Sequence, residues 1–117
     1  MKLYNLNKMK QGWFIGNFFP TSYKTKNFEV SYKVHRKNEK WPQHYHKKSD
    51  EINLIIKGKM KIRKRVLKAN DIFILKKKEI ADPKFFLDTH IICVKVPAAK
   101  DDKYCAKTHK KLSLYNT

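Results

Sequence analysis

Two histidines and a glutamate lie close together in the stretch WPQHYHKKSDEI, residues 41–52. His44 and His46 are two residues apart, and side chains at positions i and i+2 of a strand point to the same face. The polar stretch that follows is long enough for a hairpin loop, after which Glu51 opens the returning strand beside the histidines. Two imidazoles and one carboxylate suit iron(II) and related divalent ions. The spacing therefore predicts a metal site formed by His44, His46 and Glu51.

The same stretch resembles the first motif of the cupin superfamily, which has the pattern H-x-H, four residues, E, six residues, G and ends here at Gly58. The stretch NDIFILKKKEIADPKF, residues 70–85, resembles the second cupin motif, and VKVPAAKDDKY, residues 94–104, resembles the closing strand of small bacterial cupins. The resemblance implies an all-β fold, a single jelly-roll β-barrel of antiparallel strands. It also implies a divalent metal ion, Fe, Mn, Ni or Zn, inside that barrel.

The second motif departs from the family pattern at the fourth ligand. The resemblance places a histidine at that position, but the chain has Ala81, which cannot coordinate a metal. Asp82 and His90 are the two candidates to replace it, although an extended backbone would point Asp82 to the opposite face. A vacant fourth position favours an open site over a closed structural one. It equally motivates the alternative of a cupin that holds a ligand or a partner without any metal.

Alternating apolar and polar residues predict many short strands, and these indicate a β-sandwich or barrel. We expect one domain with an N-terminal arm at 1–12, the barrel at 13–104 and a C-terminal tail at 105–117. A helical repeat of apolar residues occurs only in 101–114. In residues 28–35 the pattern predicts a half-buried strand with its apolar side chains on one face. The predicted strands are residues 13–19, 28–35, 52–56, 60–62, 71–75 and 91–96.

The net charge is +18, with 25 lysines against 3 arginines. Surfaces that recognise bases rely on the bidentate arginine side chain, so we favour a lysine-rich background over a nucleic-acid surface. We expect no membrane segment and no secretory signal, and a cytoplasmic location. Cys93 is expected in the core and, with Cys105, forms no metal-binding spacing. His35 and His109 are expected at the surface.

A row of cations follows the first motif at alternate positions of one predicted strand. One interpretation is a track for the phosphates of a nucleotide sugar or a nucleic acid. The other, which we favour, is a solvated edge strand whose charge prevents aggregation. The row consists of Lys57, Lys59, Lys61, Arg63 and Arg65.

The favoured function is a small intracellular cupin with a divalent metal that binds or converts a small polar molecule. A carbohydrate or sugar nucleotide is the first guess by analogy with other cupins. The sequence leaves open whether the protein is an enzyme; a metal-dependent isomerase, epimerase or oxygenase would use Glu51, Lys47 or Glu79 as its catalytic residue. The alternatives are a non-catalytic binding or dimerisation module and a polyanion binder. We expect a homodimer that uses residues 13–19 as its contact.

Overall fold

The computed structural model describes residues 1–112, and the regular structure in these residues is almost entirely β-strand. One short 3-10 helix, η1 (Leu6–Lys8), precedes the strands. The prediction of an all-β fold is confirmed. The strands in chain order are β1 (Trp13–Gly16), β2 (Tyr23–Lys24), β3 (Glu29–His35), β4 (His44–His46), β5 (Asp50–Lys57), β6 (Lys59–Ile62), β7 (Arg65–Lys68), β8 (Ile72–Leu75), β9 (Lys84–Phe85), β10 (Thr89–Val96) and β11 (Lys103–Cys105).

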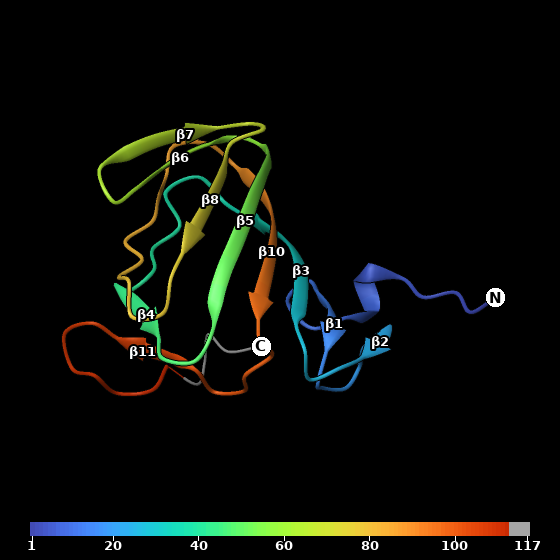
Figure 1. Ribbon diagram of the computed structural model, residues 1–117. Coiled ribbons are helices and arrows are strands. Elements are labelled where there is room, and N and C mark those ends of the chain that lie inside the picture. Colours follow the sequence, from blue (N-terminus) through green and yellow to red (C-terminus); the bar gives the residue numbers. More distant parts are fainter. Residues whose placement is uncertain (113–117) are drawn as a thin grey trace.

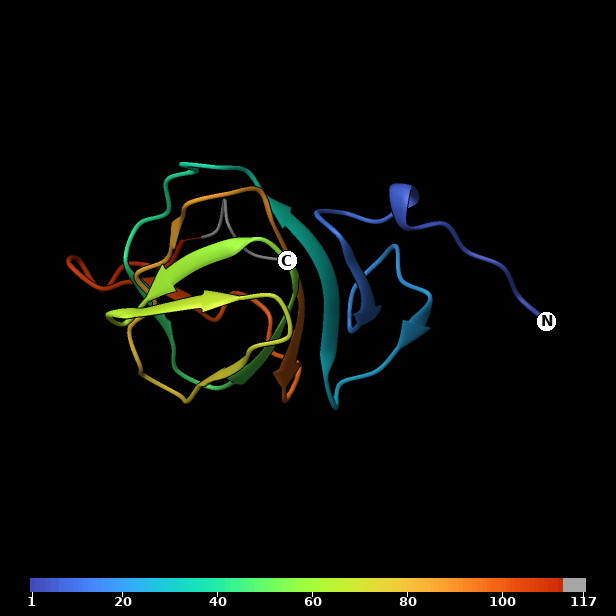
Figure 2. The same cartoon turned by 90° about the horizontal axis from the view of Figure 1, so that it is seen from above.

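The strands form three hydrogen-bonded groups that surround one interior (Figures 1 and 2). The largest is a six-stranded sheet in the order β2-β1-β3-β10-β5-β8, and the smaller ones are β7-β6-β9 and β11-β4. Neighbouring strands run antiparallel, apart from the parallel pair β1–β2. The arrangement is that of a jelly roll, as predicted, but the hydrogen bonding does not continue around the whole barrel.

On β3 the buried side chains are polar, whereas the buried faces of β5 and β10 carry both apolar residues, Ile55 and Ile91, and polar ones, Asn53 and Lys95. On β3, Glu29 and Ser31 are buried, whereas Val34 is 36% exposed. On β5, Ile52 is 39% exposed although its pattern predicts a buried face. The half-buried strand at 28–35 is therefore present, but the prediction that its apolar face turns inward is wrong. Alternation fixes the period of a strand and not which of its two faces meets the core.

The interior has an apolar part and a polar part. Apolar side chains pack together where β5, β8 and β10 meet the β6–β9 pair, and polar ones line the opposite part, near β4 and β11. Burying this many polar groups is costly unless they form hydrogen bonds or ion pairs with one another or with a ligand. The buried apolar cluster consists of Ile55, Met60, Ile62, Leu75, Ala81, Phe85 and Ile91.

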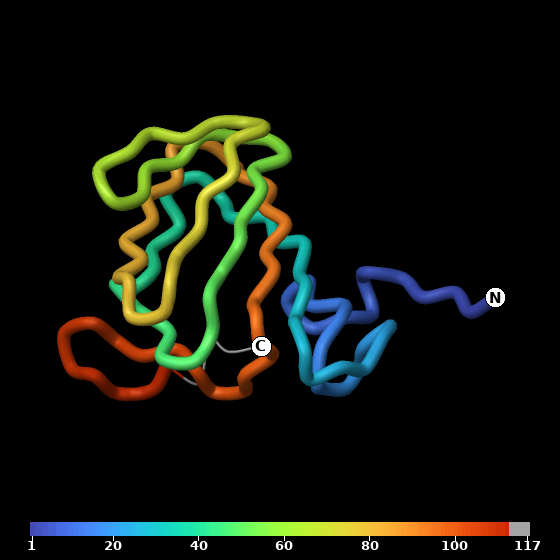
Figure 3. Tube along the Cα trace, in the orientation of Figure 1, coloured from blue at the N-terminus to red at the C-terminus, as the bar shows by residue number. Residues whose placement is uncertain are grey.

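The two ends of the described chain differ in their relation to the barrel. The N-terminal segment, with η1, β1 and β2, stands on the side of β3 that faces away from the barrel (Figures 1 and 3). Trp13 on β1 nevertheless lines the interior, so β1 takes part in the enclosure. At the other end β11 pairs with β4, so the expected boundary at residue 104 falls inside a strand. Residues 101–112 form this strand and turns rather than a helix, and residues 113–117 lie outside the described part.

Asp102 fixes the turn between β4 and β5. Its buried carboxylate accepts hydrogen bonds from the backbone N–H groups of Lys47, Lys48 and Ser49, at 2.9–3.1 Å. Backbone groups in a tight turn have no strand partner, and a carboxylate that accepts several of them replaces that partner. The C-terminal strand therefore holds the β-turn-β unit that carries His44, His46 and Glu51.

Gly58, the last residue of the first motif, allows the chain to bend sharply between β5 and β6. Its φ is +115°, a conformation that residues with a side chain rarely adopt. A Cβ atom at this position would lie 2.5 Å from the carbonyl oxygen of Asp88 and 2.6 Å from the Cα of Thr89. The glycine of the motif is therefore required by close backbone approach as well as by φ.

Candidate functional site

A cavity that opens to solvent lies inside the barrel. Its walls come from β1, β3, β4, β5, β6, β8, β9, β10 and β11, so residues far apart in the sequence meet there. Aromatic rings cover part of the wall, and polar side chains cover much of the rest. The polar lining residues are Ser31, Lys33, His35, His44, His46, Glu51, Asn53, Cys93, Lys95 and Lys103, and the aromatic ones are Trp13, Trp41, Phe73 and Phe85.

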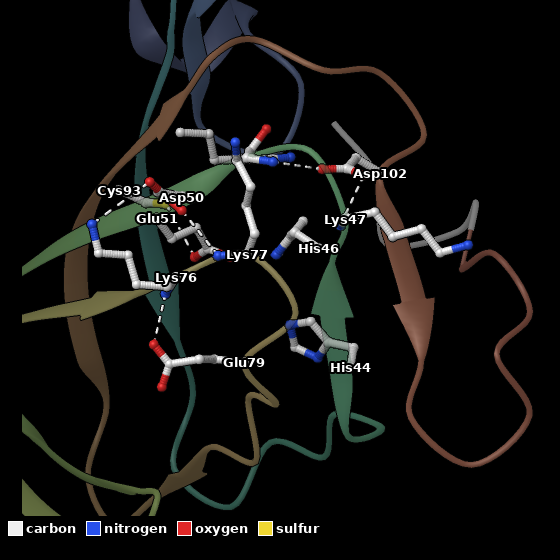
Figure 4. A network of polar contacts seen from close by, with 12 residues as sticks. His44, His46, Lys47, Asp50, Glu51, Lys76, Lys77, Glu79, Cys93 and Asp102 are labelled. Atoms are coloured by element: carbon white, nitrogen blue, oxygen red, sulfur yellow. Dashed lines mark hydrogen bonds and ion pairs between the residues drawn. The ribbon is translucent and has the colours of Figure 1, made fainter.

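The structure brings together the three residues predicted as metal ligands. His44 and His46 project from β4 to the same side, with Glu51 near them on β5 (Figure 4). The imidazole centroids of the two histidines are 5.9 Å apart and their rings are nearly perpendicular. His46 Nδ1 lies 3.0 Å from Glu51 Oε2. The hairpin loop predicted between the histidines and the glutamate is present, and it places all three side chains in one cavity.

Burial and neighbouring charges set the ionisation of this group. Burial, with the charge of Lys103, lowers the pKa of His44 to about 4, so its imidazole is neutral near pH 7. Burial alone would raise the pKa of Glu51, but the hydrogen bond from His46 and the positive charges around it hold that pKa far below its usual value. Burial and the Glu51 carboxylate raise the pKa of Cys93, which keeps a neutral thiol. Glu51 is therefore the anion of the cavity.

The donor atoms of these residues do not form a metal site in their present arrangement. His44 Nδ1 donates a hydrogen bond to the Pro42 carbonyl, which leaves Nε2 as its acceptor nitrogen. His46 and Glu51, however, are bonded to each other. Within residues 1–112 no group of three or more His, Cys, Asp or Glu side chains is placed so as to hold a metal ion. A metal ion bound by His44, His46 and Glu51 therefore stays a prediction.

The position of the missing fourth ligand lies beside the histidines. Ala81 forms an isolated antiparallel bridge with His44 and lines the cavity. Asp82 is exposed and accepts a hydrogen bond from the backbone N–H of Arg63, outside the cavity. His90 hydrogen-bonds through Nδ1 to the Tyr32 hydroxyl on the outer face of the sheet. Neither of the two predicted replacements lines the cavity with Ala81.

Three lysines that the sequence analysis did not single out line the same cavity. Lys33 from β3, Lys95 from β10 and Lys103 from β11 approach it from three strands. The Nζ of Lys33 lies 5.0 Å from the centroid of the Trp13 ring, and the Nζ of Lys103 lies 4.6 Å from that of Trp41. A lysine in this setting is positioned by its aromatic neighbours and kept from bulk water.

Burial and neighbouring positive charges lower the pKa values of Lys33 and Lys103. Burial, and then the charges of Lys33 and Lys95, lower the pKa of Lys103 to about 7 even though Glu51 opposes the shift. Burial also lowers the pKa of Lys33, and the charge of Lys95 adds to that effect. Lys95 Nζ lies 3.7 Å from the carboxylate of buried Glu29. Among the described residues, three lysines and one carboxylate, Glu51, thus line the cavity.

A signal for these lysines was present in the sequence. Lys95 is the one charged residue in the apolar run IICVKV, residues 91–96, and shares a strand face with Cys93, which was predicted to be buried. The structure confirms that Cys93 is buried. His35 was predicted at the surface but lines the cavity, where its ring stacks on Phe85 with centroids 4.4 Å apart. His109 is exposed, as predicted.

The other predicted site residues lie outside the cavity. Lys47 is exposed, with its Nζ 4.3 Å from the centroid of the Tyr104 ring. Glu79 accepts a hydrogen bond from the backbone N–H of Lys76 in the turn after β8. Of the three candidate catalytic residues, Glu51 lines the cavity and the other two do not.

The predicted row of cations is divided among several elements. Lys57 ends β5, Lys59 and Lys61 lie on β6, and the chain reverses at residues 63–64. Arg65 therefore starts the returning strand, and Arg63 donates a hydrogen bond to the carbonyl of Ile80. The five cations are not the continuous stripe that one long strand would give. They surround an exposed hairpin, and β6, which carries Lys59 and Lys61, lies between β7 and β9 rather than at the edge of its sheet. Both interpretations of the row stay predictions.

Comparisons with known proteins establish the fold. No protein-family model and no curated protein matches the sequence. A variant of PAC13 from Streptomyces solved with uridine has a TM-score of 0.66 at 10% identity, covering 92% of each chain. A cupin protein from Bacteroides fragilis has a TM-score of 0.53 at 22% identity, covering 64% of this chain and 70% of that one.

The bacterial pirin YhhW from Escherichia coli, solved in complex with nickel(II), has a TM-score of 0.59 at 12% identity; the match covers 75% of this chain and 39% of the pirin chain. The cupin resemblance of the sequence is confirmed at the level of the fold. The fold and the polar cavity together define a small cupin-fold protein with a polar cavity inside its barrel. No helix in residues 1–112 is both long and apolar enough to cross a bilayer.

Proposed function

We propose that this protein binds a small organic anion, a carboxylate or a phosphate ester, inside its barrel. The observation that carries the proposal is the presence of three lysines, Lys33, Lys95 and Lys103, around one cavity whose lining contains a single carboxylate, Glu51. Burying an ammonium group is costly unless an opposite charge compensates it. Lys95 is paired with Glu29, and the charge of Glu51 acts on both Lys33 and Lys103. An anion bound among these lysines would add a further negative charge beside them.

The other walls of the cavity support a small ligand that has both apolar faces and hydroxyl groups. The rings of Trp13 and Trp41 provide flat apolar walls next to the lysines, and Asn53 and His44 provide groups that hydrogen-bond hydroxyls. An acidic sugar or a sugar phosphate combines these features, in keeping with the carbohydrate expected by analogy.

Three related probes test the proposal: glucose, glucuronate and glucose 6-phosphate. We expect the two anions, and not neutral glucose, to raise the Tm and to bind by titration calorimetry at constant ionic strength. Their relative affinities decide between a carboxylate and a phosphate. Lys33→Met and Lys103→Met should each weaken binding about tenfold or more. Lys59→Met, which removes an exposed lysine of β6, is the matched control and should bind normally.

Equal weakening in the Lys59→Met control would mean that the probes respond to the +18 charge of the whole chain and would overturn the proposal. Absence of binding by both anions would overturn it as well. Each variant is first checked by circular dichroism, so that a loss of folding is not taken for a loss of binding.

A divalent metal at His44, His46 and Glu51 is the second candidate. The neutral imidazole of His44, with Nδ1 bonded to Pro42, is in the protonation state and tautomer that a metal ligand needs. Binding would require Glu51 and His46 to give up their mutual hydrogen bond. Elemental analysis of untagged protein and its Tm in added Fe(II), Mn(II), Ni(II) or Zn(II) test this candidate. The candidate is ruled out if the purified protein holds no metal and if added metal raises the Tm of the unaltered chain no more than that of the His44→Ala/His46→Ala variant.

The two candidates are separated by chelation. Protein treated with EDTA should still bind glucuronate or glucose 6-phosphate if the lysines hold the anion. Binding that disappears on chelation and returns with metal would favour the metal instead.

A further inference from the structure

Three buried polar atoms in residues 1–112 have no hydrogen-bond partner, and all three belong to residues that line the cavity. They are the indole Nε1 of Trp13, the hydroxyl oxygen of Ser31 and the amide Nδ2 of Asn53. These residues are 5%, 0% and 4% exposed. Buried polar groups in proteins are nearly always hydrogen-bonded, because an unpaired one makes folding less favourable. Three unpaired groups around one cavity therefore indicate that a ligand pairs with them.

The three residues belong to one row that crosses the large sheet. Trp13 on β1 lies opposite Ser31 on β3. Cys93 on β10 lies opposite Ser31 on one side and Asn53 on the other. Residues directly opposite one another on neighbouring strands share a face, so the row forms one wall of the cavity. Its fourth member, Cys93, already has a partner, because its thiol hydrogen-bonds to Glu51 at 3.4 Å.

Each of the unpaired atoms can donate a hydrogen bond. The indole and amide nitrogens are donors only, whereas the serine hydroxyl can donate or accept. A ligand that pairs with them must therefore present acceptor oxygens, such as those of hydroxyl or carbonyl groups. An apolar ligand surface against this row would leave the donors of Trp13, Ser31 and Asn53 buried and unpaired.

Two lysines of the proposed anion site flank the row. Lys33 lies two residues after Ser31, and Lys95 lies two residues after Cys93, so each is about 7 Å along its strand on the same face. Because β3 and β10 run antiparallel, the two lysines lie on opposite sides of the row. Their Nζ atoms are 5.0 and 5.7 Å from the centroid of the Trp13 ring. An anionic group held by either lysine therefore brings the rest of its molecule next to the row.

We propose that Trp13, Ser31 and Asn53 form a specificity subsite that binds the hydroxyl or carbonyl oxygens of an acid whose charge the lysines hold. The inference rests on the anion site proposed above and narrows its ligand to a hydroxylated acid, as opposed to an acid with an apolar body. The lysines give a ligand access to the buried donors. A lysine side chain is flexible, so an anion that binds the ammonium group can draw it away from Trp13 and reach the row.

Two acids with the same charge and ring size test the subsite: glucuronate, and cyclohexanecarboxylate, which has no hydroxyl group. By titration calorimetry at constant ionic strength we expect glucuronate to bind the full chain about tenfold more tightly or better, because only its oxygens pair with the donors. Ser31→Ala and Asn53→Leu should each weaken glucuronate binding about tenfold and change cyclohexanecarboxylate binding less than about twofold. If the anion site prefers a phosphate, glucose 6-phosphate and cyclohexylmethyl phosphate replace the two acids.

Ser49→Ala is the matched control for Ser31→Ala. Both serines are buried, but the Ser49 hydroxyl donates a hydrogen bond to the Pro97 carbonyl at 2.7 Å, and Ser49 does not line the cavity. Loss of the unpaired Ser31 hydroxyl should leave the Tm unchanged or raise it, whereas loss of the paired Ser49 hydroxyl should lower the Tm. The affinity of Ser49→Ala for glucuronate should equal that of the unaltered chain. A merely structural role for Ser31 predicts the opposite, a lower Tm with unchanged affinity.

The outcomes separate this inference from the anion site on which it rests. Equal binding of the hydroxylated and the apolar anion by the unaltered chain would overturn the subsite and leave the anion site standing. Variants that weaken both anions equally, or neither, would overturn it as well. If none of the anions binds, the anion site fails and the subsite fails with it. Circular dichroism verifies folding, and Asn53→Leu gives the answer if Ser31→Ala does not fold.

Discussion

The Nδ1 of His46 lies 3.0 Å from the Oε2 of Glu51, so two residues that the sequence motif assigns to a common metal ion satisfy each other instead. The Glu51 carboxylate is also close enough to Lys33, Lys95 and Lys103 to be stabilised by their charges. A positive ion placed here would have to compete with three ammonium groups for one carboxylate. The same positive charges attract an anion. For this reason we propose an anion as the first candidate ligand.

Neutralising Glu51 separates the two candidate ligands. Glu51→Gln keeps the size of the side chain and removes the only carboxylate that lines the cavity. If the lysines bind an anion, its affinity should rise about tenfold, because a nearby negative charge has been removed. If a metal occupies the site, metal affinity should fall by a similar factor or more. Calorimetry with glucuronate and with Ni(II) on the same two proteins gives both numbers.

Replacing Lys103 should stabilise the ligand-free protein while it weakens ligand binding. Native Lys103 releases its proton near pH 7, whereas the unfolded chain holds it up to about pH 10.5. The unfolded state therefore binds more protons between these values, and this group makes the stability rise as the pH rises from 7 to 10.5. Lys103→Met should remove that rise and add on the order of 3 kcal/mol to the free energy of unfolding at pH 7 and below.

Urea denaturation of unaltered protein and Lys103→Met at pH 6.5 and 9.5 measures this effect. Lys59→Met, on the exposed face of β6, should leave the pH dependence unchanged. The prediction fails if Lys103→Met is less stable than the unaltered chain at pH 6.5.

Protonation of His44 should destabilise the protein in mild acid. Its pKa is about 4 in the native state and 6.5 in the unfolded chain, so the unfolded state binds the extra proton between these values. The contribution of neutral His44 to the free energy of unfolding is fully present above pH 6.5. It falls by at most roughly 3 kcal/mol as the pH falls to 4. Lys103, which faces the imidazole, opposes its protonation, whereas Glu51 favours it.

The measurement is the free energy of unfolding at pH 7 and pH 5 after EDTA treatment. His44→Gln should lose less stability than the unaltered chain over this interval. His109→Gln, at an exposed position, is the control and should follow the unaltered chain. An identical slope in all three proteins would contradict the assignment.

Removing the Asp102 carboxylate should unfold the turn that carries the site residues. Asp102 is 1% exposed and accepts backbone hydrogen bonds from three successive residues. Asp102→Ala should cost about 3 kcal/mol, because the buried N–H groups lose their acceptor. Asp88→Ala also removes backbone and side-chain hydrogen bonds but at an exposed position, and should cost much less than Asp102→Ala. Chemical denaturation gives both values, and equal losses would show that the buried position of Asp102 has no special effect.

The structure around the first motif could be predicted from the sequence because it depends on residues that are close together in the chain. The loop between His46 and Glu51 and the bend at Gly58 each depend on residues within a few positions of one another. Short polar segments and a glycine with positive φ have few alternative structures, so spacing alone placed the histidines and the glutamate in one cavity. The all-β fold followed from the short alternating runs in the same way.

Three features depended on contacts between distant residues. Lys33, Lys95 and Lys103 are separated by up to 70 positions, and only the pairing of β3 with β10 and of β4 with β11 brings them together. Asp102 holds a turn more than 50 residues before it. Asp82 and His90 are close in sequence to the missing ligand, but their strands and turns direct them elsewhere.

The sequence by itself determined the strands, the turns between them and the histidine–glutamate unit, because these depend on short-range backbone preferences. Only the tertiary structure decided which face of β3, β5 and β10 turns inward. Alternation is symmetric between the two faces of a strand, and here the barrel encloses the polar face of β3 and the mixed faces of β5 and β10. That choice puts the lysines around a cavity and leaves valine and isoleucine on the outer surface.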